Sequence, residues 1–306
     1  MHDLPTEYHD DESRYRKNIE RYLSINPISD CSTMNRKALE EQILEKQSLL
    51  CVGIDPVQER MPARYQDCST DSLIAFSKTI IETVSPFAIA IKPNIAYFEA
   101  FGSSGWDALP RIAQIIKEHN LLSIADAKRG DIGNSSKQYA KAFFETMDFD
   151  AITLSPLMGY DSIAPFLNYK DKWSILLTMT SNPGSKDFLE QELVQGESLG
   201  YHILTSSQQW PDAEKLMYVV GATKPDELKA LREKAPEAIF LVPGVGAQGG
   251  SVAEVIQSAG TAKGGLLINA TRSIIYSDLD ADFQTSVRLS SEKMQKECAL
   301  NITLTN

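Results

Sequence analysis

A regular alternation of apolar runs and helix-like segments is the feature that most constrains the fold of this chain. Eight short runs with the length and composition of buried strands lie at 49–54, 87–91, 121–125, 151–154, 174–179, 216–220, 238–242 and 265–268. Helix-like segments separate them, including 72–83, 104–119, 135–147, 225–234 and 251–258, and a last one spans 282–300. Eight such units over roughly 270 residues predict an α/β fold of the (β/α)8 type, a TIM barrel.

An open, doubly wound sheet is the main alternative for such a pattern. When that fold binds a dinucleotide, it carries a G-x-G-x-x-G fingerprint after its first strand. Here the first run is followed by Asp55 and Pro56, without that fingerprint. No linker rich in Gly, Ser or Pro divides the alternating region, so we expect one barrel domain over residues 34–306.

The first 33 residues form an N-terminal extension that differs from the rest of the chain. They are charged, and they contain neither a strand-like run nor the apolar core of a secretory signal. Tyr15, Ile19, Tyr22 and Leu23 share one helical face. We therefore expect the extension to be either a mobile tail or a short amphipathic helix.

Charge and cysteine content exclude several classes of partner. The 306 residues include 41 acidic and 30 Lys or Arg side chains, and the formal net charge of -11 argues against nucleic-acid binding. The four cysteines lack metal-ligand spacing and are typical of reduced thiols. Because no run approaches about 18 apolar residues, no membrane span is expected. The sequence predicts a cytoplasmic protein in which any anion site must be locally positive.

The strongest candidate site is a set of alternating charges at the expected ends of two neighbouring strands. Asp126, Lys128 and Asp131 follow the third run with the spacing D-x-K-x-x-D, and Lys92 follows the second run. Catalytic residues of a (β/α)8 barrel lie at such strand ends, and neighbouring strands are about 4.8 Å apart. Two carboxylates would keep a lysine charged and fixed in direction, as a proton donor requires. A purely structural ion-pair cluster is the alternative.

A second candidate site follows the last two runs. The segment 243–250 is rich in glycine, and Arg272 follows the eighth run. Barrels commonly bind a phosphate at this place through backbone N–H groups, and an arginine adds a bidentate fork. The sequence contains no His or Cys motif with metal-ligand spacing, so no metal is expected.

Six segments together resemble the orotidine 5'-phosphate decarboxylase family, and in particular its bacterial type 2 subgroup. They read VGIDP at 52–56, IKPNIAYFE at 91–99, DAKRGDIG at 126–133, TSNPGS at 180–185, VPGVGAQGG at 242–250 and RSIIY at 272–276. The resemblance runs from Met34 to Tyr276 and leaves residues 1–33 unmatched. It implies decarboxylation of orotidine 5'-monophosphate to uridine 5'-monophosphate in de novo pyrimidine synthesis, without cofactor or metal.

The resemblance also implies a role for each matching residue. Lys128 would protonate C6 of the pyrimidine, Asp126 would lie against the substrate carboxylate, and Lys92 would bridge the carboxylates and the ribose. Asp131 and Ile132 would reach into the site of a neighbouring subunit, which implies a homodimer with shared sites. The other substrate-binding residues would be Asp55 for a ribose hydroxyl, Ser181 for the pyrimidine, Gln248 and Arg272 for the phosphate, and Asn94, Pro243 and Gly246.

Two other functions remain open on these residues. A metal-dependent sugar-phosphate decarboxylase or aldolase-like enzyme of the same superfamily can share D-x-K-x-x-D, but it resembles enzymes that place an acidic ligand where this chain has Lys92. A non-catalytic barrel that binds a phosphate ligand would have no need of four alternating charges. Chelation of metal ions and substitution of Lys128 distinguish these alternatives.

Overall fold

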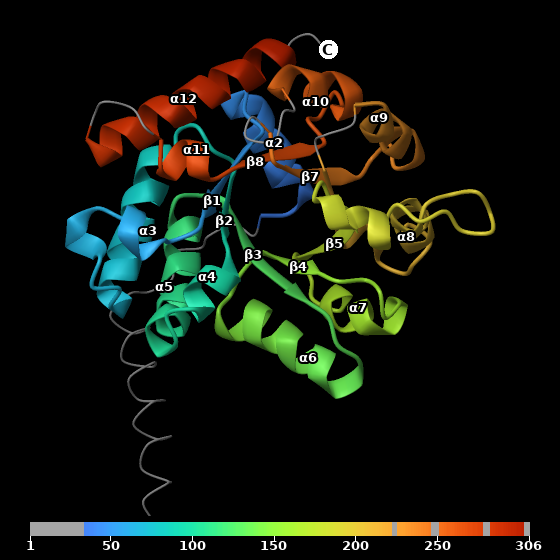
Figure 1. Cartoon of the computed structure of the whole chain (residues 1–306), viewed down its shortest axis with the longest axis horizontal. Coiled ribbons are helices and arrows are strands. Elements are labelled where there is room, and N and C mark those ends of the chain that lie inside the picture. Colours follow the sequence, from blue (N-terminus) through green and yellow to red (C-terminus); the bar gives the residue numbers. More distant parts are fainter. Residues whose placement is uncertain (1–33, 222–224, 246–250, 278–281, 303–306) are drawn as a thin grey trace, which may run out of the picture. The chain divides into compact units, whose positions relative to one another are not determined.

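The computed structural model describes residues 34–221, 225–245, 251–277 and 282–302. Within these ranges, eight parallel strands close into a barrel in sequence order (Figure 1). The strands are β1 (Leu50–Ile54), β2 (Ala90–Pro93), β3 (Leu122–Arg129), β4 (Ala151–Leu154), β5 (Trp173–Met179), β6 (Leu216–Val220), β7 (Ile239–Pro243) and β8 (Leu266–Ala270). The predicted (β/α)8 fold is confirmed, whereas the predicted extension at 1–33 lies outside the described residues.

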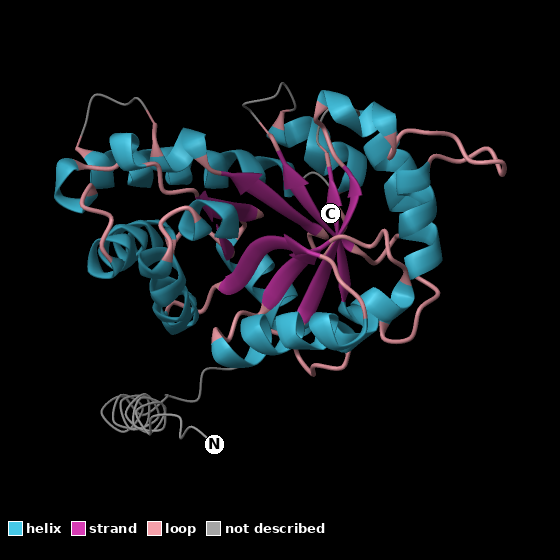
Figure 2. Cartoon of the chain, turned by 60° about the horizontal axis from the view of Figure 1, so that its bottom comes forward, coloured by secondary structure: helices cyan, strands magenta, loops and turns pink. Residues whose placement is uncertain are grey.

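Helices surround the strands on the outside of the barrel (Figure 2). They are α2 (Arg36–Lys46), α3 (Thr70–Val84), α4 (Ile95–Glu99), α5 (Ser103–Glu118), α6 (Gly133–Lys141), α7 (Tyr160–Leu167), α8 (Leu199–Ser207), α9 (Pro225–Lys234), α10 (Val252–Ala259), α11 (Arg272–Ile275) and α12 (Phe283–Ile302). No helix in the described ranges is both long enough and apolar enough to cross a membrane.

Most strand residues are apolar because both faces of each strand are covered. All five residues of β6, with the sequence LMYVV, are buried, and so are all five of β1. A parallel strand in a barrel faces the interior on one side and the outer helices on the other. Continuous apolar runs, rather than alternating ones, are therefore the pattern by which the sequence reveals this barrel.

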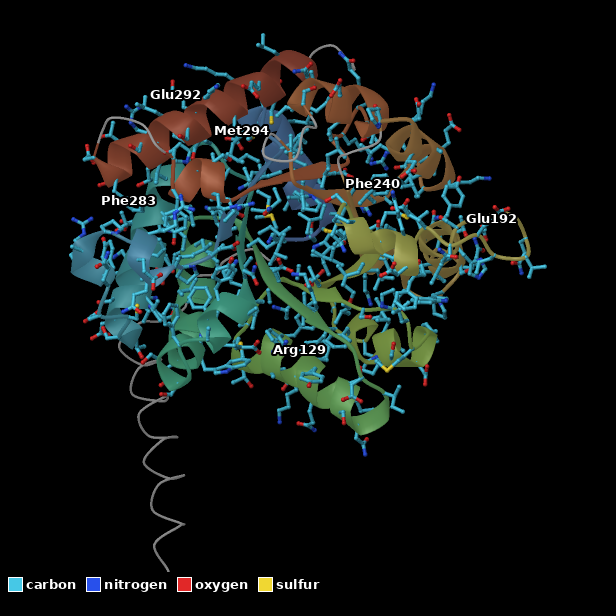
Figure 3. All side chains as sticks on the ribbon, in the orientation of Figure 1. Arg129, Glu192, Phe240, Phe283, Glu292 and Met294 are labelled. Carbon is cyan, nitrogen blue, oxygen red and sulfur yellow. The ribbon has the colours of Figure 1, made fainter. Side chains whose placement is uncertain are left out.

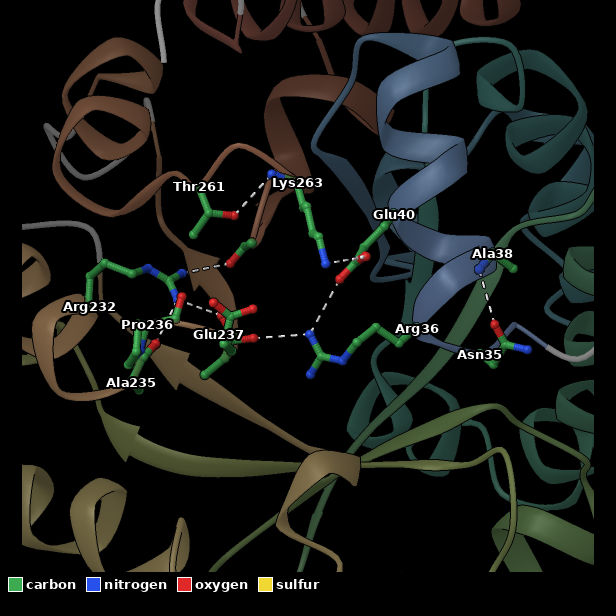
Figure 4. Close-up of polar contacts among 12 residues, drawn as sticks. Asn35, Arg36, Ala38, Glu40, Arg232, Ala235, Pro236, Glu237, Thr261 and Lys263 are labelled. Carbon is green, nitrogen blue, oxygen red and sulfur yellow. Dashed lines mark hydrogen bonds and ion pairs between the residues drawn. The ribbon is translucent and has the colours of Figure 1, made fainter. Parts of the chain in front are cut away.

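Helix α2 covers the N-terminal ends of the strands. The side chain of Asn35 caps the helix by accepting a hydrogen bond from the third residue after it (Figure 4). Arg36 Nη1 donates to the Glu237 carbonyl oxygen at 3.0 Å, just before β7. Lys46 Nζ donates to the Ser85 carbonyl oxygen at 2.9 Å, before β2. The helix thus connects loops at widely separated positions of the barrel rim.

Two strands extend further than the sequence predicts. Strand β2 includes Lys92, and β3 continues to Arg129, so the expected end of the third strand at Ala125 is wrong. The reason is that the charged residues are held by neighbouring strands. Asp126 forms a parallel bridge with Asn94, and Asp126 and Lys128 therefore belong to the wall of the barrel rather than to a loop above it.

Truncating the buried face of α2 tests its contribution to stability. Ile43 is 1% exposed, and we expect Ile43→Ala to lower the free energy of unfolding by about 2–5 kcal/mol because it leaves a cavity. Leu44, the next residue, is 40% exposed, and Leu44→Ala should change stability by no more than about 0.5 kcal/mol. Urea unfolding measures both variants, and equal effects would contradict this role of α2.

Candidate active site

The candidate site is built on an irregular stretch of β3. The pairing of β3 with β4 is regular up to Ala125 and resumes at Arg129, so three residues of β3 lie opposite the single residue Thr153. Such a bulge redirects side chains and is common next to active sites. Within it, Lys128 has a φ of 48°, a left-handed conformation that residues other than glycine seldom adopt. The bulge lets Lys128 contact Asp126, two residues earlier.

Asp126 lies between two ammonium groups. Lys92 Nζ is 2.7 Å from Asp126 Oδ2, and Lys128 Nζ is 2.5 Å from Asp126 Oδ1. The side chains of Lys92 and Asp126 are 7% and 11% exposed, whereas that of Lys128 is 52% exposed. Lys128 is therefore the cation that a ligand can reach, and Lys92 is the cation that supports the carboxylate from below the surface.

Thr153 connects the backbone of the bulge to this charge set. Its Oγ1 accepts a hydrogen bond from the backbone N of Lys128 at 2.9 Å and donates one to Asp126 Oδ1 at 3.0 Å. The residue is 1% exposed. Sequence reasoning missed Thr153, because a single threonine in an apolar strand is common and carries no pattern of its own.

Burial and neighbouring charges shift the pKa values of Asp126 and Lys92 in opposite directions. Burial alone would raise the pKa of Asp126, but the charges of Lys92 and Lys128 hold it well below its ordinary value of 3.8. Burial alone would lower the pKa of Lys92, but the charge of Asp126 more than offsets this and the pKa lies above 10.5. Asp126 and Lys92 therefore stay charged at neutral pH.

Asp55 lies next to these groups and retains an unused acceptor. Its Oδ1 is buried and has no hydrogen-bond partner among the described residues. Burial raises the pKa of Asp55, and the charge of Lys92 partly offsets the increase. A hydrogen bond from the Asn94 side chain also lowers the pKa of Asp55. An unpaired buried acceptor costs free energy, so a ligand that donates a hydrogen bond there would be favoured.

Close packing limits the size of residues below the site. An added Cβ at Gly53 would lie 1.9 Å from Thr271 Oγ1, so a larger residue would displace that side chain.

Cys51 is buried, and its Sγ lies 3.7 Å from Asn269 Oδ1. Burial raises the pKa of the Cys51 thiol to about 12. The thiol is therefore a neutral packing group.

Asp131 does not join the charge set that the sequence predicts. It forms no ion pair with Lys92 or Lys128 in the described part of the chain, and its Oδ1 accepts a hydrogen bond from the Ile132 backbone N at 2.8 Å. The side chain of Ile132 is 55% exposed. Within one copy of the chain the charge set therefore consists of Lys92, Asp126 and Lys128, and the expected role of Asp131 at the site of a neighbouring subunit stays a prediction.

The other predicted binding residues lie on the same rim. Ser181 follows β5 and lines a cavity of about 240 Å³, and Pro243 is the last residue of β7. Arg272 follows β8 and begins α11, with its side chain exposed. Gly246 and Gln248 lie outside the described residues. The rim position of each described residue agrees with the barrel prediction, and the contacts to a ligand stay predictions.

The fold and site define a class of (β/α)8 barrels with a lysine–carboxylate set at the C-terminal ends of the strands. A model of the orotidine 5'-phosphate decarboxylase / HUMPS family matches residues 48–282. This chain belongs to that family, whose members include enzymes named orotidine 5'-phosphate decarboxylase.

Individual relatives agree with the family assignment. The chain is 44% identical over 268 residues to orotidine 5'-phosphate decarboxylase of Bacteroides fragilis, covering 87% of this chain and 97% of that one. It is 46% identical over 269 residues to the same enzyme of Christiangramia forsetii, covering 87% and 98%. The solved structure of Leishmania donovani OMP decarboxylase superposes with a TM-score of 0.76 at 31% identity, covering 88% of this chain and 99% of that chain.

Removing the charge of Asp126 tests the electrostatics of the set. Asp126→Asn leaves Lys92 buried without its counter-charge, so we expect the free energy of unfolding at pH 7 to fall by about 3–5 kcal/mol. Asp131→Asn, which removes no ion pair among the described residues, should change it by about 0.5 kcal/mol or less. Urea unfolding provides both values.

The pH dependence of the same variant has a definite sign. The folded pKa of Asp126 lies below its ordinary value of 3.8, so its contribution is fully present above that pH and is lost as the pH falls through the folded pKa. We therefore expect the stability difference between wild type and Asp126→Asn to shrink in acid. A difference that stays constant down to the acid transition would contradict the assignment.

Proposed function

We propose that this chain decarboxylates orotidine 5'-monophosphate to uridine 5'-monophosphate, with Lys128 as the proton donor to C6. The observation that carries the proposal is the contact of the half-exposed Lys128 ammonium with the buried Asp126 carboxylate. A cation fixed in this way can stabilise negative charge that develops beside it and then deliver a proton. The names of the close relatives support the same reaction.

The proposed chemistry needs only these side chains and the substrate. The bond between C6 and the carboxylate carbon breaks, carbon dioxide leaves, and the electron pair stays on C6 in the plane of the ring. The Lys128 ammonium stabilises that pair and transfers one proton to C6, which leaves a neutral amine that regains its proton from solvent. Asp126 would lie against the departing carboxylate, and its charge would favour the loss of that group.

The remaining residues would bind the parts of the nucleotide that do not react. The unpaired Oδ1 of Asp55 suits a ribose hydroxyl, and Arg272 suits the phosphate. Ser181 would contact the pyrimidine. Binding energy from the remote phosphate and ribose can then be used to orient the ring against Lys128.

The metal-dependent alternative is disfavoured by the chemistry of the donors. At the end of β2, where that reading requires an acidic ligand, this chain has Lys92, and its ammonium is held by Asp126. An ammonium has no lone pair for a metal ion. The Asp126 carboxylate is already engaged by two cations, which leaves Asp55 as the neighbouring carboxylate with an unpaired oxygen.

A homodimer with shared sites is supported by the surface beside the site. Ile132, Leu157 and Met158 are 55%, 64% and 45% exposed, and they belong to the segments that follow β3 and β4. Large apolar side chains gathered on one surface are typical of protein interfaces. Asp131 lies next to this surface and has no ion pair with the site of its own chain, so it is suited to serve the site of a second copy.

An absorbance assay with orotidine 5'-monophosphate tests the proposed reaction. We expect purified protein to consume the substrate equally well with and without EDTA. Lys128→Ala should abolish turnover because it removes the proton donor, while the affinity for uridine 5'-monophosphate should persist. Loss of wild-type activity on chelation would favour the metal-dependent alternative, and near-normal turnover by Lys128→Ala would refute the proposed mechanism.

Hybrid dimers test the shared site. Lys128→Ala and Asp131→Ala should each be inactive alone. When the two variants are co-expressed with different tags, random pairing should restore about a quarter of wild-type activity, because each hybrid dimer contains one site with both residues intact. Hybrids purified through both tags that remain inactive would contradict the shared site.

A further inference from the structure

Arg129 belongs to the same motif as Lys128 but takes no part in the charge set around Asp126. It is the last residue of β3, and its side chain lies beside α6 (Figure 3). The guanidinium carbon is 5.6 Å from the ring centroids of both Tyr139, in α6, and Phe143, in the π-helical turn η3 (Ala142–Thr146). Its side chain is 20% exposed. Arg129 is therefore packed, by cation–π contacts, onto the helical segment that follows the site.

The two terminal nitrogens of Arg129 both have partners. Nη2 binds the carboxylate of Glu99, at the end of α4, and Nη1 donates to the Ala127 carbonyl oxygen at 2.9 Å. The guanidinium is thus fixed between a neighbouring helix and the backbone of the bulge. Because both nitrogens are occupied within the chain, a direct role for Arg129 in binding a phosphate is disfavoured.

The Ala127 carbonyl belongs to the peptide group whose nitrogen is that of Lys128. That nitrogen donates to Thr153 Oγ1 at 2.9 Å, while the carbonyl oxygen accepts from Arg129 Nη1. The peptide group is therefore held on both sides. Its orientation determines φ of Lys128, which is 48°. A left-handed residue other than glycine persists only where its surroundings hold it.

We propose that Arg129 is a positioning residue for Lys128, and that Glu99 holds Arg129 in place for this purpose. Without the guanidinium, the peptide group before Lys128 can relax toward an ordinary φ, and the ammonium then moves away from Asp126 and from C6 of the substrate. This inference rests on the proposed function, since it affects turnover only if Lys128 delivers the proton.

Conservative variants of Arg129 and Glu99 test the proposal. Arg129→Lys keeps the charge but replaces the two nitrogens that bind Glu99 and the Ala127 carbonyl by one nitrogen on a shorter side chain, so we expect kcat to fall about tenfold to a hundredfold. KM and the affinity for uridine 5'-monophosphate should stay within about twofold. Glu99→Gln should lower kcat by a smaller factor, and the double variant should be no slower than Arg129→Lys alone.

Amide exchange gives a readout that is independent of turnover. In Arg129→Lys, hydrogen exchange at the Lys128 amide should accelerate, because the peptide group loses one of its two restraints. Amides of β6, on another part of the barrel, should exchange as in wild type. Glu99→Gln keeps the proposal testable if Arg129→Lys does not fold, since it removes only a charge from a side chain that is 35% exposed.

Arg232 supplies a matched control at the opposite end of the barrel. It also lies over an aromatic ring, 4.0 Å from the Phe240 centroid, and donates to backbone carbonyl oxygens, including those of Ala235 at 2.8 Å and Gly265 at 2.9 Å (Figure 4). Arg232→Lys should lower the melting temperature and leave kcat unchanged. The contrast separates a positioning role from a structural one.

The outcomes distinguish this inference from the proposed function. An unchanged kcat in Arg129→Lys, with a lower melting temperature, would make Arg129 structural and overturn the inference. A parallel loss of nucleotide affinity would make it a binding residue, which also overturns it. Turnover that survives Lys128→Ala would instead refute the proposed function, whatever the Arg129 variants show.

Discussion

The site depends on a single carboxylate, that of Asp126, which is shared by two ammonium groups. Lys92 is almost fully buried, and a buried charge without a partner costs several kcal/mol. Two lysines in contact with one carboxylate would otherwise repel each other and move apart. Asp126 therefore permits both cations at once, and the strands that carry these residues must keep their register for the set to exist.

The two ends of the barrel differ in the charged groups that they leave open to a ligand. At the N-terminal end, Arg232 donates to backbone carbonyl oxygens, and burial lowers the pKa of its guanidinium to about 10. Helix α2 adds further hydrogen bonds to backbone oxygens there. Ion pairs also occur there, since Lys117 contacts both Asp148 and Asp150 just before β4. At the C-terminal end, by contrast, the ion-paired Lys128 is half exposed, and the nearby Oδ1 of Asp55 has no hydrogen-bond partner among the described residues. Such a division places stability at one end and chemistry at the other.

Much of this arrangement can be predicted from the sequence, because it follows from repeating patterns. Apolar runs locate the eight strands, and the adjacency of the second and third strands brings Lys92 to Asp126. The remaining features of the site depend on which residues pair across neighbouring strands, and a periodic sequence pattern does not specify that pairing. The bulge in β3, the hydrogen bonds of Thr153 and the pairing of Glu99 with Arg129 all arise where regular strand pairing fails.

The local charge explains how an acidic protein can bind an anionic ligand. The chain carries a formal net charge of -11, yet Lys92 and Lys128 lie together at the site, and Arg272 lies on the same rim of the barrel. Fields from such a site act at short range and are screened less than those of exposed charges. The unfavourable free energy of bringing these charged groups together is offset during folding, when the bulge and the Arg129 contacts fix the position of Lys128. A cation held in place before the substrate arrives needs no reorganisation as charge develops, and this is the physical advantage of building the motif into a strand.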